Sequence, residues 1–483
     1  MNVEEYAAQD ATGLAELIRS GQVSRAEVDD AARTALGIAA QRLDPFAAGP
    51  FDEPLDAAPD GPFAGVPFVL KDLACNAAGV PQYLGSRALA AGITKDHDSE
   101  LMARFRRAGL ATYGSVKIPE FALNATTEPL LGGPTLNPWD PTKSPGGSSG
   151  GSAALVAAGA VPIAHANDGA GSIRIPACHT GTFGLKPSRG RVPFGPDFAE
   201  AFYGNVVEFA ITRSVRDAAA LLDAVHGPMP GERYAAPTPA RPYVDALAGP
   251  DRPLRIAVCL DDWSGQGLHA DVAAALRFTA DALSGLGHHI EIVAPMYDWE
   301  EFMVAMTTTF CAGTAADVLP LAAALGIEVD REHFEATTVA VALAGASMTP
   351  MDLAQAVAIN NKVSRTVAAF MADYDVLVTP TSLHPPVGLG HFNSDDESLS
   401  ASEWVHKVIA PHPTCALYNV TGAPAMSVPV GLSSDGLPIG LQFGADQFGE
   451  DVLLALAAQW EQAHPWSERR PALHVSVRET AGV

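Results

Sequence analysis

The sequence predicts an α/β fold with parallel strands, and three observations support this prediction. Of its 483 residues, 48% are apolar and 18% are charged, a composition that can bury a large core and is atypical of disordered or coiled-coil chains. Short apolar runs alternate with helix-like segments along much of the chain. Gly285 and Gly287 end one of these segments, as glycine does at helix C-termini. Strands that alternate with helices in this way are typically parallel.

The N-terminal half predicts helices followed by alternating strands and helices. Two helices are expected in the first 40 residues, and Ser24 and Glu27 have the spacing of a capping box at the start of the second. We interpret residues 1–45 as a helical arm. Strands are predicted at 65–70, 110–113, 254–260 and 289–293, and helices at 98–108 and 270–284.

The C-terminal part predicts a long helical segment and a hairpin. Residues from about 296 to 372 have a helical pattern and are rich in Ala and Met, so we interpret them as a helical insertion. A strand at 375–379 is stopped by Pro380. Strands at 426–431 and 437–443 flank a Ser-Ser-Asp-Gly turn, which is typical of a hairpin. Since no long linker or repeat divides the chain, we expect one domain over residues 1–483.

Charge, cysteines and hydropathy exclude several kinds of partner and site. The formal net charge of −25 would repel a polyphosphate backbone, so nucleic acid is not expected as a partner. The five cysteines are widely spaced and include no C-x-x-C pair, which indicates neither a disulfide framework nor a zinc site. The N-terminus lacks a signal-peptide pattern, and the apolar run 153–164 is shorter than the ~20 residues that span a bilayer. We therefore expect a cytoplasmic protein without a membrane partner.

The glycine-rich segment 144–152 is the first candidate for chemistry. A flexible Gly/Ser linker fits its composition but not the Ala-rich helical run that follows. A phosphate-binding loop would need a Gly-Lys-Ser/Thr ending, and no Lys occurs between Lys143 and Lys186. The segment formally contains the G-x-S-x-G motif of esterases around Ser148. That motif needs a strand leading into the serine, and the three prolines that precede Ser148 are incompatible with one.

A second candidate lies 24 residues further on, at Ser172. Small residues at Gly169, Ala170 and Gly171 allow backbone amides to converge beside the serine hydroxyl. Such a turn can form an oxyanion hole, in which each donor stabilises the transition state by roughly 3 to 4 kcal/mol. The other interpretation is a tight structural turn with a capping serine.

A nucleophilic serine needs a base. His165 and His179 are near in sequence, but each is as readily a packed or surface histidine. Lys71 follows the apolar run 68–70 and can therefore enter the interior at a strand end. Considered alone, Lys71 would be read as an exposed lysine paired with Asp72, because most lysines are exposed.

Together these segments resemble the amidase signature family, and the resemblance extends over nearly the whole chain. Lys71-Asp72, the loop around Ser148 and the run 168–177 match its motifs, as does the spacing of the two serines. Further matching segments are 135–139, 184–192, 374–381 and 436–440. Within the family, residues 126–129 and the Asp-Gly-Ala-Gly form of the second loop resemble the branch that contains 6-aminohexanoate-cyclic-dimer hydrolase.

The resemblance implies a fold and a mechanism. The fold is a large mixed β-sheet surrounded by many α-helices. The mechanism is amide hydrolysis by a Ser-Ser-Lys triad, with Ser172 as nucleophile, Lys71 as base and Ser148, on a cis peptide bond, relaying the proton between them. No metal or organic cofactor is required.

The loop that carries the nucleophile has implied roles as well. The backbone amides of Gly169, Ala170, Gly171 and Ser172 are expected to receive the oxyanion. Asp168 and Arg174 flank this loop and are interpreted as supports of it.

Physical chemistry agrees with a lysine base only if Lys71 is buried. A free lysine has a pKa near 10.4, so making it neutral at pH 7 costs roughly 4.6 kcal/mol. Desolvation can lower the pKa by several units. A carboxylate touching the amine would oppose this, and we expect Asp72 to point away because side chains alternate along a strand.

The acyl pocket is expected after the nucleophile and under the helical insertion at about 296–372, which the resemblance implies covers the cleft. Phe202, Phe310 and Cys311 are the candidate pocket residues, although aromatic and Met side chains are more often core than pocket. An apolar pocket predicts small apolar, aryl or oligoamide substrates. A carbamate or an ester would suit the same triad.

Two other functions are weighed. The glutaminase subunit of a tRNA-dependent amidotransferase shares the signature, but Ile175 stands where that subunit usually has Gln, and residues 208–212 replace its Ser-Leu-Asp-Gln segment. A non-catalytic binding protein is disfavoured by the complete triad. We expect a small-molecule amide as substrate, and the sequence leaves open whether the protein forms a homodimer.

Overall fold

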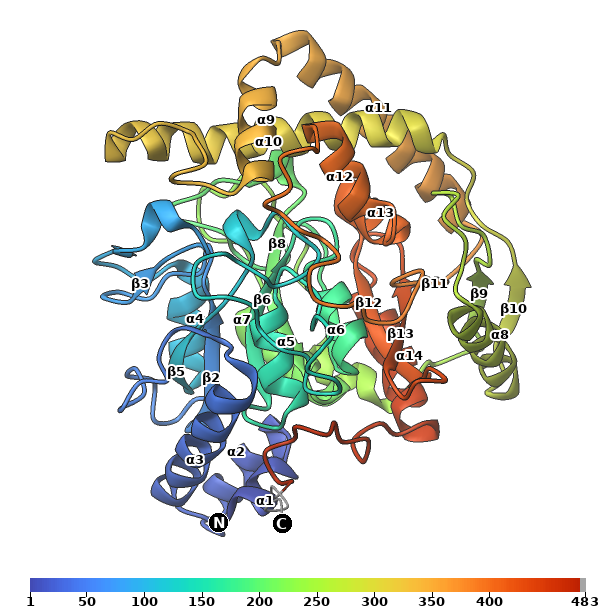
Figure 1. Ribbon diagram of the computed structural model, residues 1–483. Helices are drawn as coiled ribbons and strands as arrows, with labels where there is room; N and C mark the ends of the chain where they lie inside the picture. Colours follow the sequence, from blue (N-terminus) through green and yellow to red (C-terminus); the bar gives the residue numbers. More distant parts are fainter. Residues whose placement is uncertain (478–483) are drawn as a thin grey trace.

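The computed structural model describes residues 1–477, and a mixed eight-stranded sheet lies at its centre (Figure 1). The strands of this sheet are β6 (Ile163–Asp168), β7 (Phe183–Lys186), β8 (Val207–Thr212), β9 (Arg255–Val258), β10 (His289–Ile292), β11 (Val376–Pro380), β12 (Ala425–Leu432) and β13 (Pro438–Gly444). They lie side by side in the order β10-β9-β11-β13-β12-β7-β8-β6. The last residues of the expected domain, 478–483, lie outside the described part of the chain.

Only one edge of this sheet is parallel. β10, β9 and β11 pair in parallel, whereas the remaining neighbours pair antiparallel. The prediction of parallel strands, made for the alternating segments 254–260 and 289–293, is confirmed by β9 and β10, and the other neighbours from β11 to β6 are antiparallel. The reason is that β12 and β13 form the predicted hairpin in the middle of the sheet, and that β8 pairs antiparallel with both β6 and β7. The mixed sheet that the family resemblance implies is confirmed.

A smaller sheet lies beside β6 and carries the candidate lysine. Its strands are β1 (Phe46–Ala48), β5 (Leu110–Val116) and β2 (Val66–Lys71), in that order, with β2 and β5 parallel. β2 packs next to β6 (Figure 1). Lys71, the last residue of β2, is thereby brought near the end of β6. Two further short strands, β3 (Pro81–Gln82) and β4 (Ile93–Thr94), form a separate hairpin.

The N-terminal arm contains three helices, not the predicted two. They are α1 (Val3–Ala7), α2 (Ala11–Arg19) and α3 (Arg25–Leu43), and α3 begins with the predicted capping box of Ser24 and Glu27. The extra helix forms because Asn2 and Glu5 make a second capping box, while Asp10 caps α2. Each cap starts a new helix, so the first of the two predicted helices is divided into α1 and α2.

The other helices surround the two sheets. They are α4 (Glu100–Ala108), α5 (Gly150–Ala157), α6 (Arg174–Thr180), α7 (Val215–Val225), α8 (Ala270–Gly285) and α14 (Glu450–Ala463). Of these, α4 and α8 begin and end within two residues of the predicted 98–108 and 270–284. Four short 3₁₀ helices lie in loops: η1 (Arg87–Leu89), η2 (Glu120–Ala122), η3 (Phe202–Gly204) and η4 (Tyr243–Ala248). α4 begins at the cap residue Ser99 and ends at Gly109, whose φ of 89° is the left-handed conformation that favours glycine.

The predicted helical segment forms three long helices, α9 (Trp299–Leu325), α10 (Ala336–Ala346) and α11 (Pro350–Met371), followed by α12 (Ala401–Ile409) and α13 (Pro413–Thr421). Figure 1 shows α9 to α11 across one end of the molecule, opposite α1 to α3. α9 is long and apolar enough to cross a membrane, but 67% of its most apolar stretch is buried inside the protein. Burial of that extent is typical of a core helix.

One apolar cluster joins the two ends of the described chain. It includes Tyr6 of α1, Leu36 of α3, Phe68 of β2, Leu441 of β13 and Val475. A second cluster lies between α9, α11, α12, α13 and the β9–β11 edge of the sheet. The catalytic candidates are therefore held by strands and helices that are themselves anchored in apolar cores.

Candidate active site

Lys71 is fully buried at the C-terminal end of β2. Its Nζ lies 2.7 Å from Ser148 Oγ, 2.5 Å from Asn167 Oδ1 and 3.5 Å from the Asn167 carbonyl oxygen. All three partners are uncharged. A neutral amine in this position can donate to Asn167 and accept a proton from the Ser148 hydroxyl.

Ser148 lies in the glycine-rich loop that leads into α5. The peptide bond between Gly147 and Ser148 is cis. Thr127 fixes the loop, because its hydroxyl donates to the Gly146 carbonyl at 2.9 Å and accepts from the Gly150 amide at 3.1 Å. A Cβ on Gly147 would lie 2.5 Å from the Thr126 carbonyl oxygen, so no larger residue fits there. The loop enters from irregular chain and not from a strand, unlike the esterase motif.

Ser172 lies in the turn between β6 and α6. Asp168, the last residue of β6, accepts the amides of Gly171 at 2.7 Å and Ile173 at 3.1 Å. The chain therefore folds back over the Asp168 carboxylate. This turn places Ser172 beside the loop of Ser148, where the Ser149 amide donates to the Ser172 carbonyl at 3.3 Å.

Arg174 neutralises Asp168 in the interior. Its Nε and Nη2 bind the two carboxylate oxygens at 2.9 and 2.7 Å, and both side chains are fully buried. Burial alone would raise the pKa of Asp168, but the Arg174 guanidinium outweighs burial and holds it well below its ordinary value. Both residues thus support the Ser172 turn, as the sequence led us to expect.

Three backbone amides around Ser172 are free to bind an oxyanion. In the part of the chain that the structure describes, the amides of Gly169, Ala170 and Ser172 have no hydrogen-bond acceptor. The expectation for Gly171 is wrong, because its amide already donates to Asp168. The Gly171 φ of 126° and the close approach of Ile175 leave room only for glycine here. Gly171 therefore shapes the turn and does not serve as a donor.

Burial sets the protonation of Lys71. Desolvation lowers the pKa of Lys71 to about 7, although the carboxylates of Glu208 and Asp168 act in the opposite direction. Asp72 points away, as alternation along the strand predicts, and its carboxylate accepts the Tyr83 amide at 3.1 Å. Near neutral pH a substantial fraction of Lys71 is therefore uncharged and able to accept a proton.

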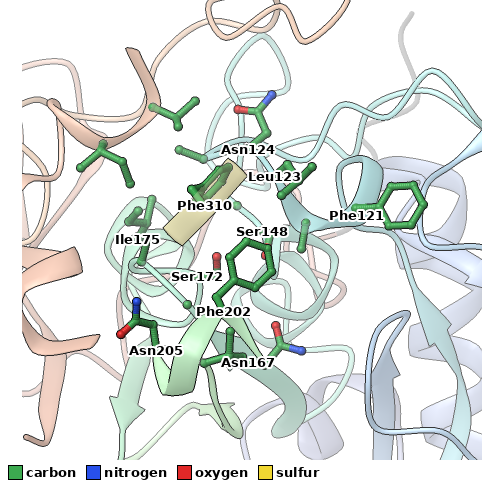
Figure 2. Close-up of a pocket in the computed structure, with 18 of the residues that line it drawn as sticks. Phe121, Leu123, Asn124, Ser148, Asn167, Ser172, Ile175, Phe202, Asn205 and Phe310 are labelled. Atoms are coloured by element: carbon green, nitrogen blue, oxygen red, sulfur yellow. The ribbon is translucent and has the colours of Figure 1, made fainter. Parts of the chain in front are cut away.

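Ser148 and Ser172 line the same cavity. Figure 2 shows their side chains next to each other, with the rings of Phe202 and Phe310 nearby. The other lining residues are mainly apolar: Leu73, Phe121, Ala122, Leu123, Asn124, Ala125, Gly147, Asn167, Gly169, Ala170, Ile175, Asn205, Val206, Met306, Thr309, Val408 and Ile409. None of the described lining residues carries an ionisable side chain. The cavity thus suits an uncharged, largely apolar molecule.

Two of the three predicted pocket residues line the cavity, and the third does not. Phe202 and Phe310 line the cavity and contact each other, with ring centroids 5.5 Å apart. The prediction is wrong for Cys311, which is fully buried in the apolar cluster behind α9. Successive residues on a helix point about 100° apart, so Cys311 does not face the cavity that its neighbour Phe310 lines. The helical insertion reaches the cavity through Met306, Thr309 and Phe310.

Neither histidine near the loop is placed as a base for Ser172. His165 Nδ1 accepts the Lys71 backbone amide at 3.2 Å, and its Nε2 lies 2.6 Å from Glu208 Oε2. His179 is buried on α6 with its ring 5.9 Å from that of His412. Among residues 1–477, no group of three or more His, Cys, Asp and Glu side chains is arranged to hold a metal ion.

Sequence reasoning missed two asparagines of the site. Asn167 binds the Lys71 amine, and Asn419 of α13 donates to Asp168 Oδ1 at 2.9 Å and to the Asn205 carbonyl at 2.9 Å. The alternation along β6 could have revealed Asn167, since His165 and Asn167 project to the same face as the approaching Lys71. No local signal marks Asn419, which lies 251 residues from Asp168.

Comparison with known proteins identifies the family of this chain. The family model described as "Amidase" matches residues 47–454, which is most of the chain. The chain belongs to the amidase family. As a member of this family it is a hydrolase of amides.

This amidase is similar to two characterised enzymes over nearly its full length. It is 35% identical to the 6-aminohexanoate-cyclic-dimer hydrolase of Paenarthrobacter ureafaciens over 476 residues, which cover 96% of this chain and 97% of the relative. It is 36% identical to the enzyme of the same name from Pseudomonas sp. (strain NK87) over 482 residues, or 96% of this chain and 97% of the relative. The branch that the sequence motifs indicate is therefore confirmed.

Solved structures show the same fold. The structure of 6-aminohexanoate cyclic dimer hydrolase superposes on the amidase with a TM-score of 0.89 at 35% identity, covering 97% of this chain and 99% of the other. A bacterial aryl acylamidase of the amidase signature family superposes with a TM-score of 0.84 at 27% identity, covering 97% and 99%.

Proposed function

We propose that this amidase hydrolyses uncharged apolar amides, including aryl amides and cyclic or linear oligoamides, through an acyl-enzyme on Ser172. Ser148 and Lys71 act as the proton relay. The observation that carries this proposal is the 2.7 Å contact between Lys71 Nζ and Ser148 Oγ, in a fully buried position beside the cavity that Ser172 lines.

The geometry supports the following reaction. Ser172 Oγ attacks the carbonyl carbon of the amide and passes its proton to Ser148, which passes its own proton to the Lys71 amine. The carbonyl oxygen takes the negative charge and is held by the amides of Gly169, Ala170 and Ser172. When the C–N bond breaks, the proton returns through Ser148 to the leaving nitrogen. Water then attacks the acyl-enzyme by the same relay, and Ser172 is restored.

The cavity supports the substrate class. Its lining is largely apolar, without ionisable side chains among the described residues, so a charged group would enter without a counter-charge. A cyclic diamide, on which the two similar hydrolases act by name, has no net charge. Free glutamine carries an ammonium and a carboxylate that this cavity would leave unpaired. The glutaminase alternative is therefore disfavoured.

Hydrolysis of a substrate panel tests this proposal. The panel contains anilides, aliphatic amides, cyclic and linear oligoamides, carbamates, esters and glutamine. We expect the wild-type protein to prefer uncharged apolar amides, and Ser172→Ala to lose at least ~10⁴-fold in kcat/KM. Ser188→Ala, which removes a buried hydroxyl away from the cavity, is the matched control and should keep wild-type activity.

Two outcomes would count against the proposal. Turnover by Ser172→Ala at the wild-type rate would exclude Ser172 as the nucleophile. A preference for glutamine, for carbamates or for esters would leave the triad in place and overturn the substrate class.

A further inference from the structure

A buried histidine and glutamate lie directly behind Lys71. His165 Nδ1 accepts the Lys71 backbone amide at 3.2 Å. Because Nδ1 is the acceptor, the ring proton lies on Nε2, which donates to Glu208 Oε2 at 2.6 Å. The chain Lys71–His165–Glu208 thus links the backbone of the base to a carboxylate two strands away.

Neighbouring strands hold this pair in place. His165 and Asn167 lie on β6, and Glu208 of β8 is the register partner of Asn167. Asn167 in turn accepts the Lys71 amine. His165 and Glu208 are 0% and 3% exposed, and the Phe105 ring closes one side of the histidine at 5.9 Å. Neither residue contacts the cavity, so both act through Lys71 and not on the substrate.

Glu208 differs from the other charged groups around Lys71 because it has no cationic partner of its own. On β6, Asp168 is neutralised by Arg174 of α6, with Lys186 of β7 nearby. Directly after β2, the Asp72 carboxylate turns away and accepts the Tyr83 amide.

No other charged group compensates the Glu208 carboxylate among the described residues. Burial raises the pKa of the Cys75 thiol well above its ordinary value, so that thiol carries no charge. In the described chain, Glu208 has no ion pair with Lys or Arg, and its Oε1 has no hydrogen-bond partner.

This unbalanced charge has a use in the proposed reaction. When Lys71 accepts the proton from Ser148, it becomes an ammonium in a site from which water is excluded. An uncompensated buried cation is strongly unfavourable, and a nearby carboxylate reduces that cost. Burial lowers the pKa of Lys71. Two carboxylates oppose this lowering, and Glu208 has a larger effect than Asp168.

We propose that the His165–Glu208 pair is a positioning unit for Lys71: His165 holds the backbone of the base, and the Glu208 carboxylate stabilises the ammonium that forms as Lys71 takes the proton. This inference rests on the proposed function, since it assumes that Lys71 is the base. It makes Glu208 a determinant of the pH range and the strength of the base.

The test is the rate of covalent labelling by an uncharged fluorophosphonate as a function of pH, which needs no knowledge of the substrate. For Glu208→Gln we expect the acid limb of the profile to move to lower pH by about one unit and the plateau rate to fall several-fold, because a base with a lower pKa is neutral at lower pH but accepts a proton less readily. Glu208→Met provides a second charge-free variant in case the glutamine variant does not fold. Glu208→Asp keeps the charge and should keep the wild-type limb.

Glu461→Gln is the matched control. Glu461 lies on α14, accepts the Val215 amide and is remote from the cavity, so this variant should leave the limb unchanged. Thermal melting of every variant verifies the fold. If folded Glu208→Gln or Glu208→Met keeps the wild-type limb while Lys71→Ala is unlabelled, the role of Glu208 is overturned. If Lys71→Ala is labelled at the wild-type rate, the proposed function itself fails.

Discussion

Lys71 shows how burial lowers the pKa of a lysine, as the proposed role of a base requires. An exposed lysine with a pKa near 10.4 must overcome roughly 4.6 kcal/mol to become neutral at pH 7. At a pKa of about 7 that cost nearly vanishes. The protein meets the cost of burial with apolar neighbours on β2 and with three uncharged acceptors around Nζ. The same environment would penalise a substrate with a permanent charge.

The pH dependence of activity follows from this value. The base must be neutral to accept the proton, so kcat/KM for an anilide should fall on the acid side of a pKa near 7 and approach tenfold per unit below it. Lys71→Ala should reduce acylation by several orders of magnitude at every pH. A wild-type rate that stays constant from pH 8 to pH 5 would show that the group with this pKa is not the base.

Helix α6 carries a second buried titratable group close to the nucleophile. His179 is fully buried, and neither of its ring nitrogens has a hydrogen-bond partner among the described residues. Burial, together with the nearby His384, lowers the pKa of His179 to about 3. The folded protein therefore holds this ring neutral.

Stability should consequently depend on the protonation of His179. Below pH 6.5 the unfolded chain binds a proton at this histidine and the folded chain does not, so the free energy of unfolding falls as the pH falls. The loss at pH 5.5 relative to pH 8 is about 1.4 kcal/mol for this group. His179→Gln should remove that loss, measured by urea unfolding at the two pH values. His406→Gln makes the same change at an exposed position on α12 and serves as control.

If His179→Gln loses as much stability between pH 8 and pH 5.5 as the wild type does, the buried ring is not the source of the loss. Both pH values also lie above the pI of about 4.8. At the pI itself the protein has no net charge and would tend to precipitate.

Local signals predicted the secondary structure well where caps and glycines mark its ends. The capping box of Ser24 and Glu27, the end of α4 at Ala108 and the turn between β12 and β13 all fall where the sequence indicates. Strand direction was harder to predict, because neighbours such as β11 and β13 are far apart in the chain. Pairing across such distances is decided by packing, which leaves no periodic signal in either strand.

The site draws on parts of the chain that only the complete fold brings together. Lys71, Ser148 and Ser172 could be named from motifs, and the structure brings the Lys71 amine to the Ser148 hydroxyl and both serines to one cavity. Gly171 and Cys311 could not be assigned correctly, since the direction of the Gly171 amide depends on its contact with Asp168 and the burial of Cys311 depends on the packing of α9. Asn419 and Glu208 gave no sequence signal, because their roles arise from contacts between distant elements.

The whole chain has a net charge of −25, whereas none of the described residues that line the cavity is ionisable. Such a charge disfavours the approach of anionic substrates and has no evident part in bond cleavage. In the proposed reaction a few side chains carry out the chemistry, and the rest of the chain holds them in position.

Ser172 is tested most directly by labelling the purified chain, without any partner, with a fluorophosphonate and locating the adduct by peptide mass spectrometry. We expect one adduct, on Ser172, that forms in the wild type and is absent in Ser172→Ala. An adduct on Ser148 or on another residue, or undiminished labelling of Ser172→Ala, would contradict the claim that Ser172 is the nucleophile of this amidase.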